Sequence, residues 1–190
     1  REVAAYRLSE ALGWGLVPLT ILREGPHGVG SFQLFIHADF EQHYFTLLER
    51  PEHRERLMQI CLFDLVANNA DRKGGHCLLG ADDTIYAIDN GLTFHAEPKL
   101  RTVIWDFAGE PIPRAASAAI ERLLNEGVPE TVAQLLDRQE LNPLLARGKA
   151  LARRGRFPAD ARGSVRRAAT ILASSGITRS FFVRTSCIGT

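Results

Sequence analysis

The chain has 190 residues, of which 45% are hydrophobic and 24% are charged, and its formal net charge is +1. This globular composition allows one hydrophobic core or two small ones. No run of 18 apolar residues occurs, so we expect no transmembrane helix. The small net charge does not indicate the basic surface that is typical of nucleic-acid binding. Three cysteines without Cys-x-x-Cys spacing argue against a disulfide scaffold and fit a reducing cytoplasm.

The first residues predict a helix followed by a β-hairpin. Apolar residues at helical spacing mark a helix over Val3–Leu12, which Gly13 closes. Val17–Arg23 and Ser31–Ile36 are typical of strands, and residues 24–30 contain three glycines and a proline, which favour a turn. Because the helical pattern begins at once, we expect the chain to start inside a domain.

The middle of the chain predicts helices, a polar loop and a second hairpin. Helices are expected at Phe40–Leu48 and Glu52–Asn68, and the second is so apolar that it should be a central core helix. Asn69–His76 is polar and Gly-rich, which indicates a loop. Short strands are then expected at Cys77–Leu79 and Ile85–Ile88.

The remainder up to residue 157 predicts helices alone, which makes the whole an α+β protein with one helix-rich lobe. The expected helices are Leu100–Phe107, Arg114–Glu126, Glu130–Leu136 and Leu141–Arg154.

Residues 158–190 differ from the rest in charge. They hold five arginines and one acid, a net of +4, whereas residues 1–157 hold 18 basic and 21 acidic residues, a net of −3. Apart from a weak helical stretch at Val165–Leu172, this tail has no clear apolar period. We expect it to be poorly ordered. A functional basic tail and a non-native end are the alternatives.

The candidate chemistry lies in residues 68–94. Asp71 begins the polar loop after the apolar helix, and Asp89 ends the second strand of the following hairpin. Two carboxylates at the mouth of one hairpin suit phosphoryl transfer, in which one orients an incoming hydroxyl and the other holds Mg²⁺ on ATP phosphates. Arg72 or Lys73 would neutralise negative charge on the transferring phosphoryl group, or would only anchor the loop through salt bridges. Each motif alone is weak, since Asn-Gly is above all a turn signal.

Three stretches together match one family. Gly30–Ile36 (GSFQLFI) resembles the hinge strand, Asn69–Leu79 (NADRKGGHCLL) the catalytic loop and Ala87–Phe94 (AIDNGLTF) the metal-binding motif of phosphatidylinositol 3- and 4-kinases. Glu2–Thr20 resembles the helix and strand that precede the hinge. The match covers about residues 1–107. Within this family, the sequence most resembles the type II phosphatidylinositol 4-kinases, and it is also similar to a group of actinobacterial proteins.

The resemblance implies a protein-kinase-like α+β fold. Residues 1–36 would be the remnant of a small lobe with the hinge, residues 37–157 a helical catalytic lobe, and residues 158–190 the basic tail. Asp71 would be the catalytic-loop aspartate, and Asp89 would ligate the metal. The adenine would be held by the backbone of Gln33, Leu34, Phe35 and Ile36, with Ile88 or Leu78 packed beneath the purine.

Glu2 or Glu10 would stand in the place of the family's helix glutamate, which pairs with the ATP-binding lysine. We prefer Glu2 to Glu10. The alternative for both is a charge that simply faces solvent.

Two departures from the family pattern affect the expected activity. His76 stands where the family has a second metal-binding asparagine, so it would bind Mn²⁺, contact a phosphate or not touch metal at all. Asn69 could supply an amide oxygen instead. No lysine and no Gly-rich loop precede the hinge. We therefore expect the small lobe to be truncated and the chain as given to be a poor catalyst.

The acceptor is predicted from charge. Because residues 1–157 are slightly acidic, a soluble protein or small molecule is favoured over an anionic lipid surface. Trp105 is a candidate on the substrate side, although a core role is the simpler interpretation.

Two other functions stay open: a kinase-like module that binds nucleotide or a partner without turnover, and a nucleotidyl transferase on the same fold.

Overall fold

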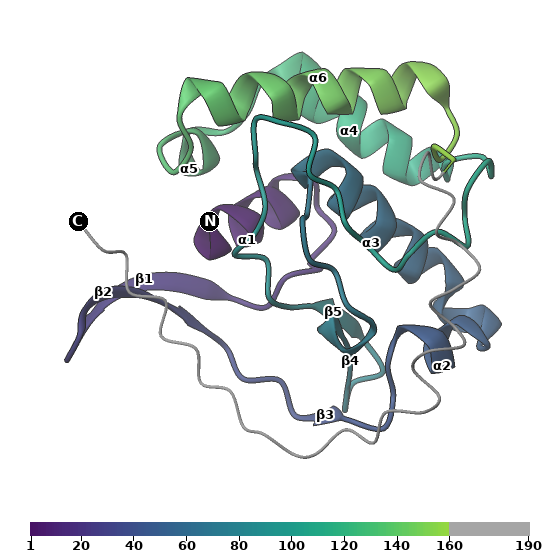
Figure 1. The fold of residues 1–190 in the computed structure, drawn as a ribbon, viewed down its shortest axis with the longest axis horizontal. Coiled ribbons are helices and arrows are strands. Elements are labelled where there is room, and N and C mark those ends of the chain that lie inside the picture. Colours follow the sequence, from purple (N-terminus) through teal and green to yellow (C-terminus); the bar gives the residue numbers. More distant parts are fainter. Residues whose placement is uncertain (160–190) are drawn as a thin grey trace.

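The computed structural model describes residues 1–159, which form an α+β fold with two small antiparallel sheets, as the sequence predicts (Figure 1). Single 3₁₀ turns lie at Pro51–His53 and Gly74–His76. The helices and strands are α1 (Glu2–Ala11), β1 (Thr20–Gly25), β2 (Gly28–Gln33), β3 (Ala38–Asp39), α2 (Tyr44–Leu48), α3 (Arg54–Ala67), β4 (Cys77–Gly80), β5 (Ile85–Ala87), α4 (Arg114–Glu126), α5 (Glu130–Ala133) and α6 (Arg138–Arg154).

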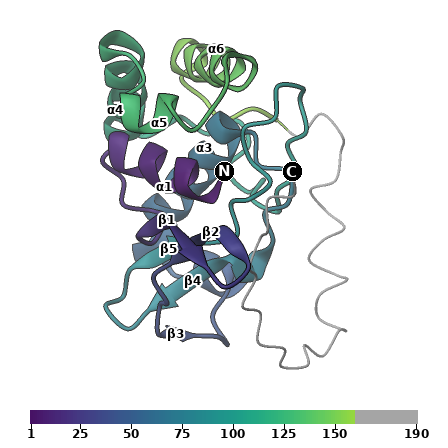
Figure 2. The ribbon, with the colours of Figure 1, turned by 90° about the vertical axis from the view of Figure 1, so that its left-hand side faces the viewer.

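The two sheets lie at the opposite end of the molecule from α4, α5 and α6 (Figure 1 and Figure 2). Strands β1 and β2 form a hairpin in which Thr20 pairs with Gln33. The other sheet has the order β3–β4–β5, with Cys77 opposite Ala87. Helices α1 and α3 lie between the sheets and the distal helices.

Helix α3 is the central element of the core. It is apolar on nearly all sides, and every residue from Ile60 to Ala67 is buried. A helix that is hydrophobic all round requires neighbours on every side. Residues of α1, α4 and α6 therefore join α3 in one continuous core.

A buried hydroxyl fixes the segment between α1 and the first hairpin. Ser9 Oγ accepts hydrogen bonds from the backbone N–H groups of Leu16, at 2.7 Å, and Val17, at 3.3 Å. The carbonyl of Leu16 in turn accepts from the N–H of Ala87 in β5, at 2.8 Å. This chain of bonds ties α1 to the strand that leads to the expected metal-binding motif.

Most of the predicted elements are confirmed, with shifted ends. The second strand occupies Gly28–Gln33 instead of Ser31–Ile36, and the helix expected at Phe40–Leu48 begins only at Tyr44. The tail expected to be poorly ordered falls outside the described residues from position 160 onward.

The helix predicted at Leu100–Phe107 is wrong. There the chain is extended and then turns, and Arg72 and Thr102 form a parallel β-bridge. The backbone groups of Arg101 and Val103 bond to Asn69 and Arg72, which leaves them no helical partners. A tertiary pairing has therefore overridden a local apolar pattern.

None of the helices within residues 1–159 combines the length and the apolar run needed to cross a membrane.

Candidate functional site

Two loops flank the β4–β5 hairpin and carry the candidate residues. The first, residues 68–76, follows α3, and the second, residues 88–93, follows β5. The N–H of Ile88 donates to the carbonyl of His76 at 3.0 Å, so the loops meet where the hairpin begins and ends. Both loops turn through left-handed backbone, at Asn68 (φ 54°) and Asp89 (φ 55°), a conformation in which Asn and Asp are enriched.

A buried ion pair anchors the first loop to α3. Arg72 Nε lies 3.0 Å from Asp64 Oδ2 and Nη2 lies 2.9 Å from Oδ1, and both side chains have no exposed surface. Burial alone would lower the pKa of Arg72, but the charge and hydrogen bonds of Asp64 outweigh it and raise that pKa. The guanidinium is therefore charged, and it is bidentate on its partner.

The same guanidinium also holds the second loop. Arg72 Nη1 donates to the carbonyl of Ile88 at 2.7 Å, and Nη2 donates to Asn90 Oδ1 at 2.7 Å. Asp64 Oδ2 accepts in addition from Thr102 Oγ1 at 3.4 Å. The Asp64–Arg72 pair thus fixes α3, both loops and the bridge segment. Of the two roles expected for Arg72, the geometry favours loop anchoring over contact with a phosphoryl group.

Asp71 is placed by its neighbour Asn69. Asn69 Oδ1 accepts from the N–H of Asp71 at 3.0 Å, and its Nδ2 donates to Asp64 Oδ1 at 3.0 Å. The Asp71 carboxylate is 37% exposed and lies 2.8 Å from Lys73 Nζ, which is itself 61% exposed. Asp71 and Lys73 are therefore accessible to a ligand.

Asp89 lies beside His76 at the mouth of the hairpin. Asp89 Oδ2 is 3.4 Å from His76 Nε2, and the carboxylate is 39% exposed whereas the imidazole is 13% exposed. Burial lowers the pKa of His76 and outweighs the opposing charge of Asp89. At neutral pH the imidazole is therefore uncharged.

Glu2 reaches the same loop from α1. Its Oε2 accepts from the N–H of Asn90 at 3.1 Å, and a Cβ on Gly91 would lie 3.2 Å from its Oε1. Burial raises the pKa of Glu2; the Asn90 hydrogen bond opposes this shift and the charge of Asp89 adds to it. Glu10 is exposed. Of the two candidates, Glu2 lies at the site.

The metal donors expected here divide into accessible and inaccessible groups. Asp89 and His76 are adjacent, but Asn69 is fully buried and its amide oxygen already accepts from Asp71. Within residues 1–159 no three His, Cys, Asp or Glu side chains gather closely enough to hold a metal by themselves. Any metal here would need further ligands from a bound phosphate or from water.

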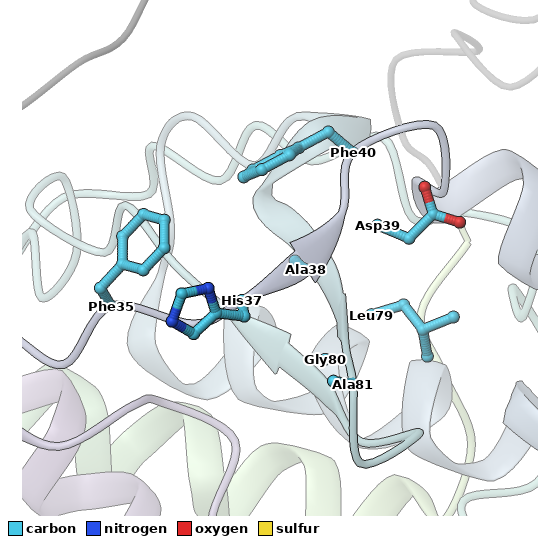
Figure 3. Close-up of a pocket in the computed structure, with 8 residues that line it drawn as sticks. All are labelled: Phe35, His37, Ala38, Asp39, Phe40, Leu79, Gly80 and Ala81. Atoms are coloured by element: carbon cyan, nitrogen blue, oxygen red, sulfur yellow. The ribbon is translucent and has the colours of Figure 1, made fainter.

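Of the residues expected to hold the adenine, Phe35 lines the hollow that lies beside the expected hinge segment. A hollow of about 370 Å³ lies beside the expected hinge segment, and Phe35, His37 and Phe40 stand around it (Figure 3). The rings of Phe35 and His37 meet edge to face, 5.2 Å apart. Its remaining lining residues are Ala38, Asp39, Leu79, Gly80 and Ala81, so Leu78 and Ile88 are not among them.

The segment expected to be the hinge is only partly free to bind a ligand. The N–H of Leu34 donates to the carbonyl of Leu19 at 2.8 Å, and Gln33 Nε2 donates to Thr20 Oγ1 at 2.9 Å. The side chains of Leu34 and Phe35 are exposed, whereas Leu78 in β4 is buried.

Sequence reasoning missed the residues that support the site: Asp64, Asn90 and Thr102. Asp64 is an acid inside an otherwise apolar helical run, and a charge at such a position requires a buried partner. That signal was available, although it does not reveal which arginine is the partner. Asn90 was interpreted only as part of a turn.

No family model matches the chain. It is 35% identical to Protein Rv2133c of Mycobacterium tuberculosis, in an alignment that covers 80% of this chain and 67% of that relative. This α+β protein, with two loops held by a buried Asp–Arg pair, belongs to the family of Protein Rv2133c.

Removing one partner of the buried pair should destabilise the fold strongly. Arg72→Met or Asp64→Leu would leave an uncompensated buried charge, and each should lower the free energy of unfolding by about 3–5 kcal/mol. The double variant should lose less free energy of unfolding than the sum of the losses in the two single variants. Urea unfolding of the three variants measures this.

The control is Arg54→Met, which breaks the exposed Arg54–Glu110 pair (2.6 Å) near the other end of α3. It should change stability by no more than about 1 kcal/mol. Equal losses in Arg72→Met and Arg54→Met would contradict the anchoring role.

Glu2 should make stability depend on pH. Its pKa is raised by folding, so folding favours the protonated acid. The wild type should therefore lose stability relative to Glu2→Gln as the pH rises from below about 4.5, the ordinary Glu value, through the raised value. Thermal melts across this range measure the difference. A flat profile for Glu2→Gln would refute the prediction.

Proposed function

We propose that this chain carries the catalytic site of an ATP-dependent phosphotransferase, a kinase that acts on a hydroxyl group. The observation that carries the proposal is that two partly exposed carboxylates, Asp71 and Asp89, lie on loops that one buried arginine holds together. Fixed geometry of this kind is what phosphoryl transfer requires, since its catalysis is almost entirely positioning and charge stabilisation. The resemblance to phosphatidylinositol 3- and 4-kinases points in the same direction.

In the proposed reaction, Asp71 orients the acceptor hydroxyl and takes its proton. The acceptor oxygen forms a bond to the γ-phosphorus of ATP, and the bond from that phosphorus to the β,γ-bridging oxygen breaks. ADP leaves with the electron pair of that bond. Lys73, 2.8 Å from Asp71, can place positive charge near the transferring group.

The residues present fit a divalent cation held mainly by Asp89. Mg²⁺ prefers oxygen ligands and is usually bound by one or two carboxylates together with substrate phosphates and water. The lone exposed carboxylate of Asp89 matches that pattern. The neighbouring imidazole of His76 suits Mn²⁺ better than Mg²⁺. When bound, the cation would supply charge neutralisation on the phosphates.

One observation favours a second candidate, a kinase-like module that binds nucleotide or a partner with little or no turnover. The imidazole of His76 lies against the Asp89 carboxylate, where the family pattern has an amide oxygen donor. An uncharged imidazole weakens a site for a hard cation. Nucleotide binding without product formation would distinguish this candidate from the kinase.

The acceptor in this proposal is a soluble protein or a small molecule. Residues 1–157 carry a net charge of −3, which opposes stable binding to an anionic membrane surface.

Metal-dependent stabilisation by ATP tests the proposed site. A ligand that binds only the folded state stabilises it by about 2.7 kcal/mol at a hundredfold excess over its dissociation constant. The melting temperature should therefore rise with ATP and Mg²⁺ or Mn²⁺, and Asp89→Asn should abolish most of the rise because the main metal ligand is gone.

Asp83→Asn provides the matched control. Asp83 is also an exposed aspartate in left-handed backbone (φ 61°), but it lies in the turn at the far end of the β4–β5 hairpin. It should keep the full ATP response. An equal response in both variants, or none in the wild type, would reject Asp89 as the metal ligand.

A further inference from the structure

We propose that the chain binds a zinc ion in a hollow at the turn of the β4–β5 hairpin, through the imidazole of His53 and the carboxylate of Asp83, with Glu52 as the third ligand. The site lies at the other end of this hairpin from the two candidate loops, and it does not depend on the proposed kinase activity. The bound ion would tie the start of α3 to the hairpin turn.

His53 is a buried histidine with a ring nitrogen that has no hydrogen-bond partner. It ends the 3₁₀ turn that precedes α3, and its side chain is only 5% exposed. Within residues 1–159, His53 Nε2 is one of two buried side-chain nitrogen or oxygen atoms that lack a partner. Buried polar atoms are nearly always satisfied, so an exception calls for a bound water or ion. The neutral imidazole nitrogen is also the commonest metal ligand in proteins.

A hollow of about 370 Å³ lies at this histidine, between the 3₁₀ turn and the hairpin turn. Its wall carries two carboxylates, Glu52 and Asp83, whose side chains are 55% and 68% exposed. The remaining lining residues are Arg56, Thr84 and Ile85. Arg56 donates to the backbone carbonyls of Gly15 and Ile85, so its guanidinium is already engaged. The groups left to meet a ligand are one imidazole and two carboxylates.

The separation of the imidazole and the Asp83 carboxylate suits a zinc ion. His53 Nε2 lies 3.7 Å from Asp83 Oδ1, which is too far for a hydrogen bond. In a tetrahedral zinc site the metal lies about 2.0–2.2 Å from its nitrogen and oxygen ligands, so two such ligands lie about 3.3–3.6 Å apart. Because Asp83 is an exposed side chain, a small movement brings it into this range.

Arg50 now holds the third ligand. Its Nε lies 3.1 Å from Glu52 Oε1, and its Nη2 lies 3.8 Å from Asp83 Oδ1. Exposed pairs of this kind contribute little stability, so a divalent ion can displace the guanidinium. Glu52 would then join the metal, and water would complete the coordination.

The donor set favours zinc over the cations of the proposed nucleotide site. Mg²⁺ prefers oxygen ligands alone, whereas imidazole suits Zn²⁺, and Mn²⁺ binds such sites most weakly of the first-row divalent metals. His76 and Asp89 also combine an imidazole with a carboxylate, 3.4 Å apart. The experiment must therefore report zinc binding residue by residue.

NMR titration of the full chain with zinc chloride, without nucleotide, tests the site. Zinc should shift the backbone amide signals of His53, Asp83 and Thr84, and the shifts should saturate. Asp83→Asn should weaken the zinc affinity that these signals report at least about tenfold, since loss of even an outer partner of a metal ligand costs about 10–100-fold. Asn is well tolerated in the left-handed backbone of this position (φ 61°), so the variant should fold.

Asp82→Asn is the matched control. Asp82 is an exposed aspartate in the same turn, and its carboxylate accepts from the N–H of Thr84 and from the hydroxyl of Tyr86. This variant should keep the zinc affinity of the wild type. Arg50→Gln should bind zinc more tightly, because the ion no longer has to displace the guanidinium.

The outcomes separate a zinc site from a merely structural cluster. Saturable shifts at His53 and Asp83 that Asp83→Asn loses and Asp82→Asn keeps would establish the site. Unchanged signals at both residues in excess zinc, or equal zinc affinities in the two aspartate variants, would overturn it. Weaker zinc binding in Arg50→Gln would contradict the displacement of the guanidinium by the ion.

Discussion

The buried ion pair between Asp64 and Arg72 is the interaction on which the candidate site depends. Each candidate carboxylate lies on a loop, and loops hold their shape only when their backbone groups find fixed partners. Arg72 supplies such partners to the loop after β5, and Asp64 supplies them to the loop after α3 through Asn69. The pair fixes the two loops that carry Asp71 and Asp89 and that meet at one end of the hairpin, and it is not exposed itself.

Burying two charges is costly, and an apolar pair of similar volume is often as stable. Here every hydrogen bond of the pair reaches a segment that must be placed: α3, both loops and the bridge at Thr102. We therefore interpret the pair as a device for positioning. The exposed groups, Asp71, Lys73 and Asp89, are left free to meet a ligand.

Much of the fold could be predicted from the sequence because hydrophobic periodicity is local. The core helix that ends at Ala67 and the strands of the β4–β5 hairpin were found from their patterns. The helix expected at Leu100–Phe107 failed because its backbone bonds to a loop about 30 residues earlier, which no local pattern reveals. The inward direction of Arg72 also depends on that bridge, so the sequence left two roles open for it. The roles assigned to Asp71 and Asp89 by resemblance stay predictions.

Paramagnetic broadening by Mn²⁺ tests the central claim most directly. With ATP present, Mn²⁺ bound at Asp89 should broaden the NMR signals of the backbone amides of Asp71, His76, Asp89 and Asn90, and leave those of the distal α4 and α6 sharp. Omitting ATP should reduce the effect, because the phosphates supply part of the coordination. Broadening centred on other residues, or broadening that is the same with and without ATP, would contradict the account of two carboxylates set around one nucleotide.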